Sequence, residues 1–173
     1  MSRGATRWWG SASLGALAIP TASLLGLVGC LGSAPPAPPV RWFDATPTSE
    51  PRPAAVPLRF RQASTVGSDF VLRVGPRELV FDSEHRWAAE PVQFLARALV
   101  GAAGGTPCEV ELVTFEFDLQ QAPTARVGVR YGTPGVLVVV ERVASGRSAP
   151  ELAEAMVAAL EAVAGDLVAR LGN

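Results

Sequence analysis

Apolar and polar residues alternate along the start of the region that we expect to fold. Leu58-Arg59-Phe60-Arg61 places its apolar side chains on one face and its arginines on the other, as a strand with one wet face does. Residues 70–74 and 78–81 are two further apolar segments, and Gly75-Pro76 between them is a turn signal. The pattern predicts a strand over residues 58–61 followed by a β-hairpin.

The spacing becomes helical after residue 88. We expect a helix to begin at Ala89 or Glu90, with Pro91 in its first turn, where the missing N–H has no helical acceptor. The glycines that begin at Gly101 are expected to end it. The apolar positions repeat at helical spacing and predict a side that packs on the core: Val92, Phe94, Leu95, Ala98 and Leu99.

Three more strands are expected between residues 110 and 140. In the first, the apolar positions switch from even to odd numbers between Leu112 and Val113, which indicates a β-bulge or a strand that crosses between two environments. The second alternates over residues 126–131. The third, residues 136–140, is a continuous apolar run, which is typical of a central strand covered on both faces.

The last predicted element is a helix. Ser148-Ala149-Pro150-Glu151 has the form of a capping box, and apolar residues then repeat at helical spacing as far as Leu171. The order of strands, helix, strands and helix predicts an α+β fold, with a mostly antiparallel sheet and two helices packed on one of its faces. We expect this domain to span residues 57–173.

Residues 1–29 have the layout of a secretory signal peptide. Arg3 and Arg7 form a positive start, and a small-residue apolar stretch follows over residues 11–28. No later apolar run is long enough to cross a bilayer, so we expect no transmembrane helix in the mature protein.

The end of this stretch, Leu27-Val28-Gly29-Cys30, resembles the bacterial lipobox. The resemblance implies cleavage between Gly29 and Cys30 and attachment of lipid to Cys30. Several acyl chains would hold the protein at a membrane, because each buried CH₂ contributes roughly 0.8 kcal/mol. Leu31, where an aspartate would signal inner-membrane retention, favours the outer membrane over the inner. The alternative is a secretory signal whose cysteine is incidental.

Residues 30–56 are expected to form a proline-rich tether behind the lipidated cysteine. Eight prolines lie between residues 34 and 57, and the first cluster predicts a semi-rigid polyproline stalk. Trp42 and Phe43 lie between the proline clusters. They are expected either to form a short edge strand on the domain or to dock on another protein.

The composition and the chemistry of the side chains limit the classes of function that we expect. A net charge of −1 provides no basic excess to neutralise phosphates, so we expect no nucleic-acid partner. The chain has one histidine, His85, no Gly-x-Ser-x-Gly elbow and no Cys/His cluster with metal-ligand spacing. With Cys30 lipidated, Cys108 has no internal disulfide partner and is expected to be a buried small hydrophobe. We therefore expect a protein without catalysis, metal or cofactor.

One stretch is distinctive: Phe81-Asp-Ser-Glu-His-Arg-Trp-Ala-Ala-Glu-Pro91. It resembles the strand-to-helix junction "hRWAxxP" of the ABC-type transport auxiliary lipoprotein family, the PqiC-like lipoproteins that accompany MCE-domain lipid transport systems. The family also has a lipobox near its start, an aromatic pair soon after the anchor, which Trp42 and Phe43 match, and a capped amphipathic helix at its end.

The resemblance implies a non-enzymatic lipoprotein, anchored in the bacterial envelope and facing the periplasm. Its expected partners are an MCE-domain protein and an ABC permease and ATPase, and a homo-oligomer is plausible. Trp42 and Phe43 are candidates for partner binding. The junction residues are expected to be mainly structural: His85, Arg86, Trp87, Glu90 and Pro91. The alternative function is a lipoprotein adaptor or scaffold in outer-membrane assembly or envelope maintenance.

Overall fold

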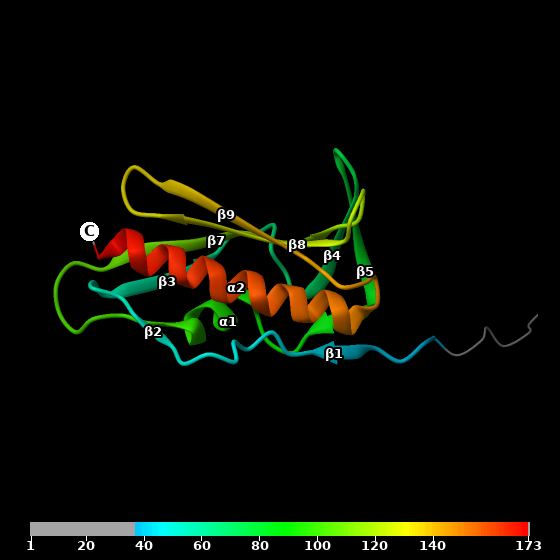
Figure 1. Cartoon of the computed structure of the whole chain (residues 1–173), viewed down its shortest axis with the longest axis horizontal. Helices are drawn as coiled ribbons and strands as arrows, with labels where there is room; N and C mark the ends of the chain where they lie inside the picture. The colour runs from blue at the N-terminus through cyan, green and yellow to red at the C-terminus, as the bar shows by residue number, and fades with distance from the viewer. Residues whose placement is uncertain (1–36, 173) are drawn as a thin grey trace, which may run out of the picture. The chain divides into compact units, whose positions relative to one another are not determined.

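The computed structural model describes residues 37–172, which contain a seven-stranded mixed sheet with two helices on one of its faces (Figure 1). The strands run in the order β1-β5-β4-β7-β8-β9, and β3 pairs with β7 as well. The elements are β1 (Arg41–Phe43), β2 (Arg52–Pro53), β3 (Leu58–Gln62), β4 (Asp69–Gly75), β5 (Glu78–Trp87), α1 (Pro91–Ala98), β6 (Leu99–Val100), β7 (Cys108–Asp118), β8 (Thr124–Tyr131), β9 (Val136–Val143) and α2 (Ala149–Leu171).

The long pairings of the sheet are antiparallel. They join β4 to β5, β7 to β8 and β8 to β9, whereas the shorter pairings of β1 with β5 and of β3 and β4 with β7 are parallel. Helix α2 packs on β8 and β9, and α1 packs on β3, β7 and α2. The expected α+β fold, with a mostly antiparallel sheet and two helices on one face, is confirmed.

The phase switch in β7 is a bulge. The register of β7 against β8 shifts between Leu112 and Thr114, so Val113 is the extra residue. Because of this one-residue insertion, Leu112 before it and Phe115 after it both face the core, with at most 3% of either residue exposed. A regular strand would have turned one of these two groups of apolar side chains to the solvent.

Helix α2 forms one wall of the core. Its capping box is present: the Ser148 hydroxyl and N–H both bond to the Glu151 carboxylate, at 2.6 and 3.0 Å. The predicted stripe packs against the sheet, and all of it except the half-buried Leu171 at the helix end is less than 5% exposed: Leu152, Met156, Ala159, Leu160, Val163 and Leu167. The expected helical face is therefore the one that packs.

Helix α1 is shorter than expected. It ends at Ala98, and Leu99–Val100 form the extended strand β6 beside Arg52–Pro53. The Ala54 N–H also bonds to the Val100 carbonyl at 2.8 Å. The prediction that the helix runs to Gly101 is wrong because a distant segment provides strand partners there, although Leu99 is buried as expected.

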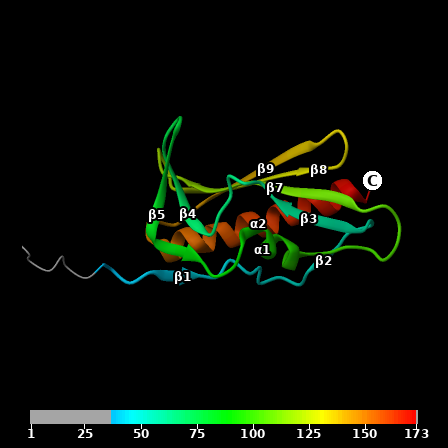
Figure 2. The same ribbon diagram turned by 180° about the vertical axis from the view of Figure 1, so that it is seen from behind.

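Strand β9 corrects a second expectation. Residues 136–140 do not form a central strand, because β9 lies at the end of the sheet order (Figure 2). Helix α2 covers one of its faces, where Val138 is buried. Leu137 and Val139, which point the other way, are 55% and 44% exposed. The apolar run thus belongs to an edge strand, which has no strand partner on its outer side within the described residues.

The folded body also begins earlier than expected. Its compact unit starts at Pro38, and within the segment assigned to the tether Ala45 is fully buried and β1 and β2 join sheets. The boundary expected at residue 57 therefore moves to about residue 38. The signal peptide, Cys30 and the chain as far as Pro36 lie outside the described residues, and with them the expected cleavage site between Gly29 and Cys30.

Candidate functional site

Strand β1 brings the two stretches that carry the family resemblance together. It runs parallel to the last part of β5, with Arg41 opposite His85, Trp42 opposite Arg86 and Phe43 opposite Trp87. The aromatic pair and the junction, which are far apart in the sequence, are thus one ladder at the edge of the sheet (Figure 1). We call this ladder, Arg41–Phe43 with residues 85–87, the β1 edge.

The two aromatic residues of β1 have opposite environments. Phe43 points toward the core and lies 5.2 Å from the Phe70 ring and 5.6 Å from the His85 ring, measured between centroids. Its carbonyl accepts a hydrogen bond from the Ala88 N–H at 2.8 Å. Trp42, the next residue, must point to the other side of the strand and is 60% exposed. Phe43 therefore attaches the strand, and Trp42 is free to contact a partner.

Trp87 lies at the centre of an aromatic cluster. It is 1% exposed and stacks on Phe70 with centroids 4.3 Å apart, and it forms a T-shaped contact with Phe115 at a centroid distance of 5.1 Å. Phe94 of α1 and Phe117 of β7 complete the cluster. The expectation that Trp87 fills the space between helix and sheet is what the packing shows.

His85 and Arg86 are held by acidic neighbours. The His85 ring nitrogen Nδ1 lies 2.7 Å from the Asp82 carboxylate, which also accepts the Glu84 N–H. Partial burial opposes ionisation of Asp82, but these hydrogen bonds outweigh it and lower the pKa of the carboxyl. Arg86 forms an ion pair with Asp69 at 3.0 Å. Both of these side chains of the β1 edge therefore have an acidic partner.

Glu90 and Pro91 belong to the start of α1. Gln62, at the end of β3, donates to the Glu90 carboxylate at 3.0 Å and accepts the Val92 N–H at 3.0 Å, so it caps the helix from another strand. Pro91 is buried in the first turn. Gln62 could not be identified as a cap from the sequence, because a cap from a distant strand leaves no local signal.

The chain after β1 is also bonded to the body. Asp44 accepts hydrogen bonds from the Thr46 hydroxyl and N–H, which lower the pKa of its carboxyl despite partial burial. Thr46 in turn accepts Arg97 of α1 at 2.8 Å. The Glu161 carboxylate of α2 accepts both backbone N–H groups of Thr48 and Ser49. The segment that follows β1 is therefore attached to both helices of the domain.

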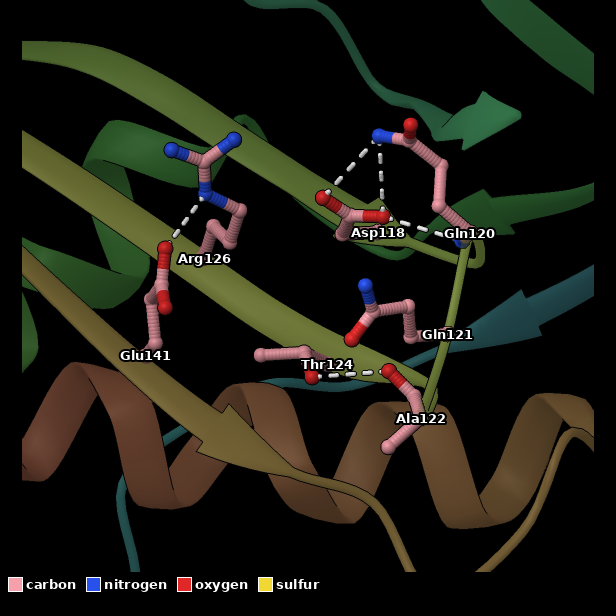
Figure 3. Close-up of a pocket in the computed structure, with 7 residues that line it drawn as sticks. All are labelled: Asp118, Gln120, Gln121, Ala122, Thr124, Arg126 and Glu141. Atoms are coloured by element: carbon pink, nitrogen blue, oxygen red, sulfur yellow. Dashed lines mark hydrogen bonds and ion pairs between the residues drawn. The ribbon is translucent and has the colours of Figure 1, made fainter. Parts of the chain in front are cut away.

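The open face of the sheet carries a polar pocket of about 340 Å³ at the turn between β7 and β8 (Figure 3). Arg126 and Glu141, which line the pocket, form ion pairs. Arg126 lies 3.1 Å from Glu116 and 2.9 Å from Glu141, and Arg73 pairs with Glu116 at 2.8 Å. Asp118 accepts the Gln120 N–H at 3.0 Å. The two arginines are thus paired with Glu116 and Glu141, whereas the Asp118 carboxylate is held by hydrogen bonds from Gln120.

Three other findings concern metal binding, the free thiol and membrane crossing. Within residues 37–172, no group of three or more His, Cys, Asp or Glu side chains is placed to hold a metal ion. Cys108 is a free, half-buried thiol that packs against the core. None of the helices in this part of the chain is both long and apolar enough to cross a membrane.

No known family model matches the chain, and no curated protein matches its sequence. Two solved structures share the fold. The first is protein XCC0632 of Xanthomonas campestris, assigned to the family DUF330, at 18% identity and a TM-score of 0.60 over 75% of this chain and 93% of that one. The second is described as an uncharacterized protein, at 10% identity and a TM-score of 0.58 over 76% and 98% of the two chains. At these identities the likeness establishes the fold alone.

Proposed function

We propose that this protein is a lipid-anchored, periplasm-facing auxiliary component of an ABC/MCE-type intermembrane lipid transport system, and that it acts by binding proteins rather than by catalysis. Under this proposal Cys30 carries the anchor, residues 31–37 begin the stalk, and the β1 edge binds the transport machinery. The partner is the MCE-domain protein or the ABC permease.

The single observation behind the proposal is the β1 edge. The aromatic pair and the His85-Arg86-Trp87 junction are the stretches that resemble the transport auxiliary family, and they are hydrogen-bonded neighbours. Such pairing is expected if the two features belong to one functional unit, and chance matches have no reason to meet in space. It supports the family resemblance without depending on overall sequence identity.

The chemistry of the β1 edge suits a protein partner. Trp42 is 60% exposed, and Val40 beside it is 42% exposed. Exposed tryptophans are the side chains that most often dominate binding energy at interfaces. The outer side of β1 has no strand partner within the described residues, so it can accept a strand from another protein.

A lipid anchor would favour binding of the domain to partners at the membrane. Anchoring confines the protein to a thin layer beside the membrane, which raises its effective concentration for a partner in the same envelope. The β1 edge comes directly after the stalk in the sequence. A short tether would therefore present it to a membrane-bound complex with little loss of entropy.

The test is photo-crosslinking in the native bacterium. The full chain would carry a photoreactive phenylalanine analogue in place of Trp42, and the matched control would carry it in place of Phe81, which is also 60% exposed. We expect position 42, but not position 81, to crosslink to an MCE-domain protein or an ABC permease. Crosslinks from position 42 to β-barrel assembly or cell-wall components would contradict the proposal and favour the scaffold function.

A further inference from the structure

Strand β9 is an uncovered edge of unusual composition. It pairs with β8 over all eight of its residues without a register shift, and its other side has no partner within residues 37–172. Natural edge strands are usually short or protected by proline, lysine or a bulge. β9 has no proline, lysine or bulge, and its two charged residues, Glu141 and Arg142, lie near its C-terminal end. Four of its apolar residues are 44–68% exposed: Val136, Leu137, Val139 and Val143.

The free hydrogen-bonding groups of this edge can be assigned. The Ala144 N–H bonds to the Pro123 carbonyl, so the backbone groups of Ala144 point toward β8. Antiparallel strands alternate inward and outward residues, and the register is uninterrupted. The N–H and C=O groups of Leu137, Val139 and Glu141 therefore point away from β8. They form a row able to accept one more strand.

The sequence of β9 is complementary to a second copy of β9 that runs antiparallel to it. In an antiparallel pair centred on Val138, Leu137 lies opposite the second copy's Val139, and Val136 lies opposite its Val140. Every apolar residue from 136 to 140 then faces another apolar residue. The outward groups of residues 137 and 139 also meet as a hydrogen-bonded pair, as the geometry requires.

The charges favour this register over those centred further toward the C-terminal end of β9. A shift of two residues would place the Glu141 carboxylate opposite Leu137, and a shift of four would place it opposite Val139, where an aliphatic side chain cannot compensate it. In the register centred on Val138, Glu141 lies opposite Gly135. A Cβ atom at Gly135 would be 2.7 Å from Arg130 Cγ and Cδ, so the Arg130 side chain covers this glycine.

This arrangement places Arg130 beside the Glu141 carboxylate of the second copy. Within one chain Arg130 already bonds to Glu111 at 3.0 Å, and Glu141 bonds to Arg126 at 2.9 Å. The contact would join these two ion pairs into one alternating row across the interface. By symmetry the same row forms at the other end of the pair.

We infer that β9 is a homodimer interface, in which two copies of this chain pair their β9 strands antiparallel about Val138 and form one continuous sheet. The inference uses only this chain's own residues. It is therefore independent of the proposed transport function and of the β1 edge.

The first test is the mass of the full-length protein in detergent, measured by analytical ultracentrifugation. The wild type is expected to be a dimer, and Val139→Lys is expected to weaken dimerisation at least about ten-fold, because a charge is placed opposite Leu137. Val80→Lys is the matched control, since Val80 is 42% and Val139 44% exposed, and it should remain a dimer. A monomeric wild type, or a Val139→Lys protein that is still fully dimeric, would overturn the inference.

The second test determines which residues of the two β9 strands lie opposite each other. Copies carrying Leu137→Cys and copies carrying Val139→Cys would be co-expressed, oxidised and digested, and disulfide-linked peptides identified by mass spectrometry. The inference predicts mixed 137–139 links above either self-link. Predominant 139–139 links, or links from both positions to an unrelated protein, would count against it.

Discussion

At the scale of single residues, two neighbouring aromatic side chains differ in their environment. Trp42 and Phe43 are adjacent in β1, yet Phe43 packs on Phe70 and His85 whereas Trp42 is largely exposed. The alternation of a strand forces this difference, because successive side chains point to opposite faces. Substitution of either residue should therefore affect a different property.

We expect Phe43→Ala to lower the free energy of unfolding by about 2 kcal/mol, less than for a fully buried phenylalanine because Phe43 is only partly buried. Trp42→Ala should change it by less than about 0.5 kcal/mol, as exposed positions usually do, while it abolishes complementation of a deletion strain. Urea unfolding and growth under envelope stress measure the two effects. Equal destabilisation by both substitutions would contradict the assignment.

Glu161 is a residue whose charge stabilises the fold. Hydrogen bonds from the Ser49 N–H, then from Thr48, lower the pKa of its carboxyl below its ordinary value of 4.5, despite partial burial. Because the folded pKa is the lower one, the stabilisation is complete above pH 4.5 and is lost as the pH falls through the folded pKa. We expect Glu161→Gln to make the free energy of unfolding fall less steeply as the pH is lowered below about 4.5.

The control for this measurement is Glu154→Gln, which alters an exposed carboxylate on the same helix. Its stability should follow the pH dependence of the wild type. If Glu161→Gln and wild type lose stability in parallel on acidification, the contact between α2 and the segment at residues 48–49 does not carry the effect.

At the scale of elements, the two helices begin in different ways. Helix α2 has a local cap, because Ser148 and Glu151 satisfy each other's groups within one turn. Helix α1 has no side-chain cap of its own and depends on Gln62 from β3. Helix α2 is therefore stabilised by its own sequence, and α1 by its place in the fold.

Loss of the local cap has an expected cost. Ser148→Ala should lower the free energy of unfolding by about 1 kcal/mol. Ser64→Ala, at an exposed turn position, is the control and should have little effect. Thermal and urea unfolding measure the difference, and equal stability of the two variants would show that Glu151 is satisfied without the serine hydroxyl.

The strands show how much of the fold could be predicted from the sequence. The sequence predicts the β4–β5 hairpin correctly, and of the two alternatives that it leaves for β7, a bulge or a strand crossing between environments, the bulge is observed. Both features arise from the local order of apolar and polar residues. The position of β9 at the edge of the sheet is not predicted, because a continuous apolar run is compatible both with a central strand and with an edge strand. Periodicity describes the faces of a strand and says nothing about its neighbours.

At the scale of the whole molecule, the proposal joins a lipid anchor, a stalk and a body that binds other proteins. Replacement of Cys30 by Ser should release the full chain from the membrane fraction into the soluble periplasm, because the acyl chains supply the membrane affinity. Fractionation and immunoblotting measure this, with Cys108→Ser as the control that keeps the anchor. A Cys30→Ser protein that sediments with membranes as completely as the wild type would exclude this anchor.

The sequence by itself determined the features that depend on near neighbours: the α+β class, the buried face and cap of α2, the hairpin, and the bulge that returns β7 to the core. The tertiary structure alone decided which strands are edges, where α1 ends, and that β1 lies against the junction at residues 85–87. The physical reason is that side-chain periodicity is a local property. Strand pairing and caps from distant residues depend instead on which parts of the chain meet when the core closes.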